Sequence, residues 1–373
     1  MQLGVGYVRI ILQENSYRLI GFQAFYINIP LMGALSPVLV FIFPSHNPRP
    51  DLTIWKKLAE IDWIGANLNG IVLVVFMIVV TLGGSTFAWN SATSITLWVV
   101  FGVCLVTYVL QQSFLIFTTE EHRIFPVHFL KSRTLVLLFV ATGGAGAAHS
   151  VTLFYTPLFF QFTRGDTSLQ AAIRLLPFIC TFIFFVMVAG GSLPVVGRYN
   201  LYFLVGGCLM VIGGALLCTI NETTSAGQFY VYEIILATGI GLVFQNAYAV
   251  AAAKVSPKDQ SKAIGFINIA QIGTIAIALS ISGSLFQNIG FHDLKSAFAG
   301  YNFRDDYIRS TLAGTISPVF SSADPDVVHI AVTTVAHTIR KIFAMVVAAG
   351  ALVTVSSLLM RFEKVDLEVV AGG

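Results

Sequence analysis

Several polar side chains lie within the long apolar runs of this chain, and Arg174 is the least expected of them. It stands about one and a half turns inside the run 169–191. A charge held in hydrocarbon costs roughly 2.5–3.5 kcal/mol on insertion-based scales, unless it snorkels to the interface or faces a polar cavity. Arg174 could therefore bind an anion or a carboxylate in a cavity, anchor neighbouring carbonyl groups, or snorkel to the outer interface.

Amide side chains are the second polar feature of these runs. In lipid, an amide usually hydrogen-bonds to another helix and contributes about 0.6–2 kcal/mol, which is the simpler interpretation of each amide alone. Taken together, the amides also suit a pocket of broad specificity, in which a few of them stand among many aromatic rings. We predict a substrate-binding site formed by Gln161, Arg174, Gln245, Asn246 and Gln271.

Proton coupling needs a membrane-embedded group whose charge changes during transport. His149 is the candidate because an imidazole titrates near neutral pH, although a lone intramembrane histidine is more often a hydrogen-bonded packing residue. Asp62 is expected to cap a helix at its start, and Glu233 stands about one turn inside its run, near the outside. We expect neither carboxylate to carry the proton, since a carboxylate must lose its water to be protonated near neutral pH.

The composition excludes most other classes of function. Of 373 residues, 56% are hydrophobic and 10% are charged, and the mean hydropathy is +0.82, whereas about a quarter of the residues of a soluble domain are charged. The chain is therefore expected to be an all-α polytopic membrane protein. No run carries the histidine or cysteine clusters or the paired carboxylates of a buried active site, so we expect no enzyme, metal or cofactor. The scattered basic residues give no patch for nucleic acid.

Apolar runs long enough to cross about 30 Å of hydrocarbon position these side chains. We predict nine spans: 25–43, 62–82, 94–117, 135–160, 169–191, 199–220, 228–253, 263–289 and a last one ending near 361. The segment 292–324 reads as polar and irregular, and Asp324 is expected to cap a helix that starts at Pro325 and leads into the last span. Glycine clusters at 143–146, 206–207 and 239–241 predict small helix faces for close approach.

The basic residues of the connectors indicate the orientation. One alternate set of connectors carries Lys or Arg at 49, 56, 57, 123, 131, 133, 198, 254, 258, 262, 361 and 364, while the opposite short connectors carry only Arg164. Basic loops remain on the cytoplasmic side. The C-terminus is therefore expected to be cytoplasmic, and the start of the first span external.

Short motifs follow one another along the chain in a recognisable order. They are FYINIP at 25–30, IDWIG at 61–65, LGG at 82–84 with WN at 89–90, FFQ at 159–161, IRLLP at 173–177 and GIGLVFQ at 239–245. In order and spacing they resemble the landmarks of the fourteen-helix drug:proton antiporter branch of the major facilitator superfamily, particularly its fungal members. The family's first five helices have no counterpart here, so the resemblance implies a partial major facilitator fold.

The resemblance also implies a division of the chain. It gives an unassigned segment (1–24), a remnant last helix of the N-terminal bundle (25–43), a central two-helix insert with its loops (44–133), a complete C-terminal six-helix bundle (134–361, with a long external loop at 290–336) and a cytoplasmic tail (362–373).

The function implied by the resemblance is secondary active transport, namely efflux of amphipathic organic compounds such as drugs, toxins or secondary metabolites by proton antiport. The alternative is a truncated, transport-incompetent fragment of such a transporter. The implied partners are a small amphipathic substrate, protons and the lipid bilayer. The plasma membrane is the expected location, with the vacuolar membrane as the alternative, and the oligomeric state stays open.

Overall fold

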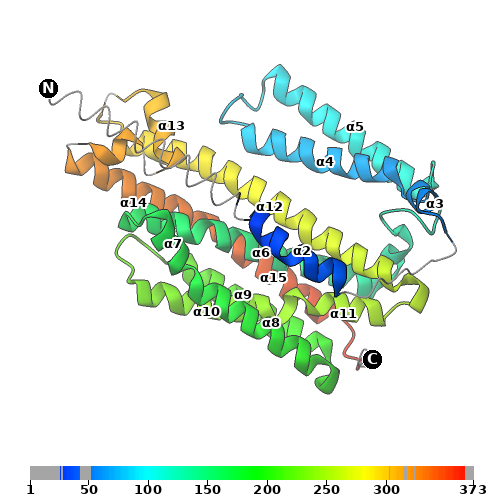
Figure 1. The fold of residues 1–373 in the computed structure, drawn as a ribbon. Helices are drawn as coiled ribbons and strands as arrows, with labels where there is room; N and C mark the ends of the chain where they lie inside the picture. Colours follow the sequence, from blue (N-terminus) through cyan, green and yellow to red (C-terminus); the bar gives the residue numbers. More distant parts are fainter. Residues whose placement is uncertain are drawn as a thin grey trace. The chain divides into compact units, whose positions relative to one another are not determined.

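The fold is all-helical in the part of the chain that the structure describes, as expected (Figure 1). A computed structural model describes residues 26, 28–42, 52–301, 303–314, 317–322 and 324–365. Within these residues, the only extended pairing is one isolated bridge between Gly83 and Phe87. The chain divides into two compact units, Met1–Glu60 and Ile61–Gly373.

The first unit contains two described helices, α2 (Asn28–Phe41) and α3 (Ile54–Ala59). The 14 residues of α2 correspond to about 21 Å of helix, which is short of a bilayer's hydrocarbon core. The ends of the predicted span 25–43 fall partly outside the described residues, and so does the unassigned segment 1–24.

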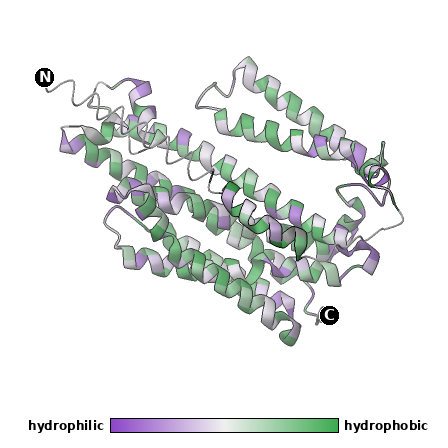
Figure 2. Cartoon of the chain, viewed as in Figure 1, coloured by the Kyte–Doolittle hydropathy of each residue, from purple (hydrophilic) through white to green (hydrophobic). Residues whose placement is uncertain are grey.

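The second unit contains eight helices or helix pairs that are long and apolar enough to cross a membrane, compared with the nine spans predicted for the whole chain. Their bodies are largely hydrophobic (Figure 2). They are α4 (Trp63–Leu82), α5 (Ala92–Phe114), α6 (Arg133–Arg164), α7 (Ser168–Arg174) with α8 (Leu176–Val196), α9 (Tyr199–Leu217), α10 (Ala226–Phe244) with α11 (Asn246–Ala253), α12 (Gln260–Ala297), and α14 (Pro325–Ile342) with α15 (Ala344–Leu359). Short 3-10 turns occur at Val127–Lys131, Pro257–Asp259 and Pro318–Ser321.

The segment 292–324 is helical over much of its described part, which corrects the prediction that it is irregular. Helix α12 continues to Ala297 and α13 (Asp305–Ala313) follows. Leu294 and Phe298 are buried, so the polar residues lie on the exposed side of an amphipathic extension. Asp324 caps α14 as predicted, because its side chain accepts a hydrogen bond of 3.0 Å from the backbone N–H of Asp326.

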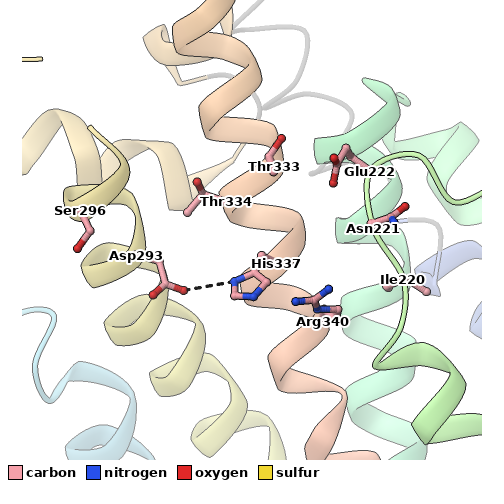
Figure 3. Close-up of a pocket in the computed structure, with 9 residues that line it drawn as sticks. All are labelled: Ile220, Asn221, Glu222, Asp293, Ser296, Thr333, Thr334, His337 and Arg340. Atoms are coloured by element: carbon pink, nitrogen blue, oxygen red, sulfur yellow. Dashed lines mark ion pairs between the residues drawn. The ribbon is translucent and has the colours of Figure 1, made fainter. Parts of the chain in front are cut away.

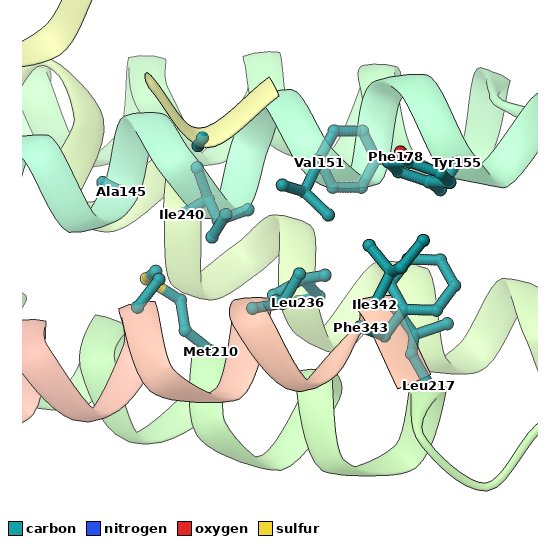
Figure 4. Packing of buried hydrophobic residues seen from close by; sticks show 14 of the residues in the cluster. Ala145, Val151, Tyr155, Phe178, Met210, Leu217, Leu236, Ile240, Ile342 and Phe343 are labelled. Carbon is teal, nitrogen blue, oxygen red and sulfur yellow. The ribbon is translucent and has the colours of Figure 1, made fainter. Parts of the chain in front are cut away.

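The core of the second unit lies where α6, α9, α10 and the α14–α15 junction meet (Figure 4). Helices α9 and α10 approach through glycine, which confirms the predicted small faces. A Cβ atom at Gly239 would lie 2.6 Å from the carbonyl oxygen of Gly206, and one at Gly206 would lie 2.7 Å from the carbonyl oxygen of Gly239. The two backbones are therefore in direct contact.

The pair α4–α5 is fixed at both ends. At one end the buried Asp62 caps α4, accepting 2.8 Å hydrogen bonds from the backbone N–H of Gly65 and from Gln112 Nε2. This confirms its predicted role as a cap. At the other end the Asn288 amide of α12 donates to the Gly83 carbonyl at 3.1 Å, which ties the α4–α5 turn to α12.

The connector between α5 and α6 docks on the bundle through aromatic side chains. The ring centroids of Phe125 and Phe129 lie 5.4 and 5.8 Å from that of Phe266 on α12. Arg123 lies 2.7 Å from Nδ1 of His128. Burial, followed by the charge of Arg123, lowers the pKa of His128 below its usual value, which favours a neutral imidazole that accepts from the guanidinium.

Candidate functional site

The candidate site lies at a break in the long helical run 226–253. Helix α10 ends at Phe244, α11 starts at Asn246, and Gln245 between them has φ −104° and ψ −21°. At the break the Tyr248 N–H donates to the Gln245 carbonyl, three residues earlier, at 3.2 Å. The Phe244 carbonyl, four residues before Tyr248, is thus free to accept from another helix.

Gln271 of α12 supplies that partner. Its Nε2 donates to the Phe244 carbonyl at 3.0 Å, and its Oε1 lies 2.8 Å from the Tyr248 hydroxyl. The same hydroxyl lies 3.2 Å from Asn268 Oδ1, so it can donate to either amide. Gln271 is buried. The Gln271 side chain therefore bonds to a residue on each side of the break, and its structural role is to pair α12 with α10 and α11.

His149 of α6 also packs next to this break. Its ring centroid lies 4.5 Å from that of Phe182, 4.9 Å from that of Phe244 and 5.7 Å from that of Phe178. Its Nδ1 is buried and has no hydrogen-bond partner among the described residues. The imidazole is therefore enclosed by aromatic rings from α8 and α10, with one nitrogen available to a ligand or a water molecule.

The structure separates the other predicted site residues into two places. At the break, Asn246 is buried and donates to the Leu242 carbonyl of its own helix at 2.9 Å, while the Gln245 side chain is exposed. Gln161 is half-buried near the far end of α6, 12 residues from His149 and thus about 18 Å along the helix. The predicted residues thus form a group at the break (His149, Gln245, Asn246 and Gln271), while Gln161 and Arg174 lie apart from it, near the C-terminal ends of α6 and α7.

Arg174 is held within the protein. Its Nε donates to Asp166 Oδ2 at 2.9 Å, its Nη1 donates to the Tyr230 hydroxyl at 3.1 Å, and its guanidinium carbon lies 5.2 Å from the centroid of Phe160. These contacts join the end of α7 to the α6–α7 turn and to α10. Of the three interpretations of Arg174, these contacts match pairing with a carboxylate, because its partners are Asp166 and Tyr230 and not the carbonyl groups of the second interpretation.

Glu233 does not keep the contact with water that was expected so close to the start of its run. It is the eighth residue of α10 and is completely buried. The reason is that α6 covers the first turns of α10, where Phe159 and Phe160 pack on Phe229 with ring centroids 5.2 and 4.8 Å apart. The helical spacing in the sequence does indicate this burial. Glu233 lies four residues after Phe229 and three before Leu236, so the three side chains share one buried face of the helix.

A polar pocket that the sequence did not indicate opens between α12, α14 and the α9–α10 turn (Figure 3). Its volume is about 400 Å³. Asp293 accepts from Lys341 at 2.8 Å and lies 3.9 Å from Nδ1 of His337. The pocket is lined by Ile220, Asn221, Glu222, Asp293, Ser296, Thr333, Thr334, His337 and Arg340.

Comparisons with known proteins identify relatives over most of the chain, although no family model matches it. The efflux pump patC of Aspergillus clavatus is 34% identical over 343 residues, which cover 91% of this chain and 62% of the pump. The MFS-type transporter patC of Penicillium expansum is 33% identical over 90% of this chain and 62% of its own length. The efflux pump DEP3 of Fusarium langsethiae is 34% identical over 89% of this chain and 60% of its own length.

A solved structure is also similar. It is that of a bacterial homologue of the human lysosomal transporter Spinster, which is 16% identical, with a TM-score of 0.44, and the match covers 79% of this chain and 65% of that chain. The chain spans about 62% of the length of the fungal relatives named first. With eight apolar helices in its described part, this chain is an integral multi-pass membrane protein, and over about nine tenths of its length it is similar to fungal MFS-type transporters.

Proposed function

We propose that this chain works in the proton-driven efflux of amphipathic organic compounds. The observation that carries the proposal is the break between α10 and α11, where Gln271 binds the free carbonyl of Phe244 at 3.0 Å. Transporters bind substrates at such discontinuous helices, where irregular backbone lines a cavity. The fungal relatives, some of which are named efflux pumps, support an outward direction.

The substrate would bind against the group at the break. The exposed Gln245 amide offers a donor and an acceptor, and the rings of Phe182 and Phe244 beside His149 offer apolar surface. One free amide beside several rings selects amphipathic molecules without demanding one shape. In this proposal Asn246 and Gln271 shape the site, whereas Gln161 and Arg174 lie towards the exit.

The orientation is part of the proposal. The connector 254–262 and the C-terminus would be cytoplasmic, because the basic connectors alternate with nearly uncharged ones. The plasma membrane is the proposed location, since efflux from the cell takes place there. A cysteine introduced at Lys258 should be protected from an impermeant thiol reagent in intact cells. Strong labelling of this cysteine in intact cells, with no further labelling once the cells are opened, would show the opposite orientation.

Vesicles from cells that express this chain test the function. An amphipathic fluorescent dye should accumulate in acid-loaded inverted vesicles, and a protonophore should abolish the accumulation. The Gln245→Ala variant should fold normally, because the side chain is exposed, and should take up less dye. Uptake no greater than in vesicles without the protein would contradict transport by this chain and favour the transport-incompetent fragment.

A further inference from the structure

The carboxyl group of Glu233 is enclosed without a charged partner among the described residues. The residue is 0% exposed, and apart from the neighbouring Thr156 hydroxyl neither carboxylate oxygen has a hydrogen-bond partner among the described residues. The buried face of α10 on which it lies is otherwise apolar, with Phe229, Leu236 and Ile240 also completely buried. A polar group in such a place requires a specific explanation.

Helix α6 presents only a hydroxyl group to this carboxyl. Thr156 is completely buried and lies beside Glu233, close enough for a hydrogen bond to the carboxyl group. Its Oγ1 has no other hydrogen-bond partner in the described part of the chain. The neighbouring Tyr155 instead packs towards α12, with its ring centroid 5.8 Å from that of Phe286. His149, the other titratable group in the middle of α6, is seven residues from Thr156, or about two turns.

The other elements around α10 bring no charge to Glu233. The helical stretches of α8, α9 and α11 contain no charged residue. Arg174 of α7 is engaged by Asp166 and Tyr230. No basic side chain within residues 52–301 or the described parts that follow forms an ion pair with Glu233, so nothing there offsets a negative charge.

An ionised carboxylate is therefore unfavourable in this arrangement. Burying one without a counter-charge or donors costs several kcal/mol, because the protein replaces none of the lost hydration. A protonated carboxyl group avoids that cost and can also exchange a hydrogen bond with the Thr156 hydroxyl. The neutral acid is the form that fits the site.

We infer that Glu233 is a proton-binding site, protonated when α10 packs on α6 as it does here and deprotonated when α10 moves and water reaches the carboxyl group. On deprotonation the O–H bond breaks, the proton passes to water and the carboxylate remains. The role of Glu233 in coupling protons to efflux rests on the proposed function. Proton binding by Glu233 does not, and it can be tested without measuring transport.

One helix links this carboxyl group to the candidate substrate site. Glu233 and Gln245 stand 12 residues apart on α10 and its end, which is about 18 Å along the axis. A shift of α10 against α6 that hydrates Glu233 would also displace Phe244 relative to His149, whose ring centroids are 4.9 Å apart. The proton and the substrate would thus act on the same movable element.

Infrared spectroscopy of the purified chain in lipid tests proton binding directly. Near neutral pH the wild-type chain should show the C=O stretching band of a protonated carboxylic acid. Glu233→Gln should remove this band, while the matched control Glu222→Gln, in the α9–α10 turn, should retain it. Thr156→Val should shift the band, because it removes the hydroxyl group beside the acid. A spectrum without the band in the wild type, or with the same band in Glu233→Gln, would overturn the inference.

Transport then tests coupling. In vesicles, Glu233→Gln should lower proton-driven dye uptake at least tenfold. It should keep the exchange of dye across the membrane at equal concentrations on both sides, because this exchange needs no net proton movement. Glu222→Gln should keep both. Full proton-driven uptake in Glu233→Gln would refute the coupling role. If the wild-type chain neither takes up nor exchanges dye, the proposed function fails, and the infrared result still decides whether Glu233 binds the proton.

Discussion

Gln271→Leu should lower the free energy of unfolding by about 1–3 kcal/mol, the usual cost of leaving one buried polar group unpaired. Leucine nearly preserves the volume but removes the donor that Gln271 Nε2 provides to the Phe244 carbonyl at 3.0 Å. The Tyr248 hydroxyl can turn to Asn268, 3.2 Å away, so the carbonyl bears most of the loss. Because the break also forms the proposed substrate site, dye uptake should fall to background.

Tyr248→Phe is the matched control for Gln271→Leu. It deletes the hydroxyl that lies 2.8 Å from Gln271 Oε1 but leaves the bond to Phe244 in place. It should cost about 0.6 kcal/mol, the mean for a hydrogen bond between membrane helices. Thermal unfolding in detergent, followed by size-exclusion chromatography, measures both variants. Equal losses in the two would show that the carbonyl at the break does not depend on Gln271.

Gly239→Ala should be the most destabilising single-methyl change in α10. The added Cβ would lie 2.6 Å from the carbonyl oxygen of Gly206 and 2.8 Å from the backbone nitrogen of Met210. Backbone atoms within a packed helix cannot turn aside as a side chain can, so α9 and α10 must separate. Overpacking of this kind costs about 1–3 kcal/mol, occasionally more, and the midpoint of thermal unfolding should fall accordingly.

Gly102→Ala is the control, because it makes the same replacement in a helix at a position without close neighbours. Gly102 lies in α5, and a Cβ there would meet no atom within 4 Å. Alanine should stabilise this helix by up to about 1 kcal/mol, because glycine loses more backbone freedom when it becomes helical. The two substitutions should therefore shift the unfolding midpoint in opposite directions. A fall of similar size in both would indicate a general effect of glycine replacement rather than the contact between α9 and α10.

Features that depend on neighbouring residues in the sequence were predictable. The apolar runs determined the membrane class and the approximate limits of the eight described spans, because hydrocarbon admits only segments that satisfy their own backbone. The caps at Asp62 and Asp324 were equally local, since a carboxylate accepts from backbone N–H groups two or three residues ahead. The order of motifs also indicated the family, which the fungal relatives confirm.

The breaks in the helices differ in how far the sequence could show them. Pro177 stands just after the junction of α7 and α8, so this break had a local signal. Gln245 has none, because the residues around it favour a continuous helix as much as a broken one. The break there is accompanied by a bond from Gln271, a residue of α12 that lies 26 positions further along the chain.

Glu233 shows most clearly what only the tertiary structure decided. The sequence by itself determined that a carboxyl group lies about one turn inside an apolar run, at helical spacing from Phe229 and Leu236. The structure starts α10 at Ala226, which places Glu233 two turns inside the helix. Distance from the end of the run suggested access to water. Whether water reaches the group depends on which helix covers that face, and α6 closes it with Phe159 and Phe160. Hydration of a side chain is a property of its neighbours in space, and packing of α6 on α10 is what removes the water.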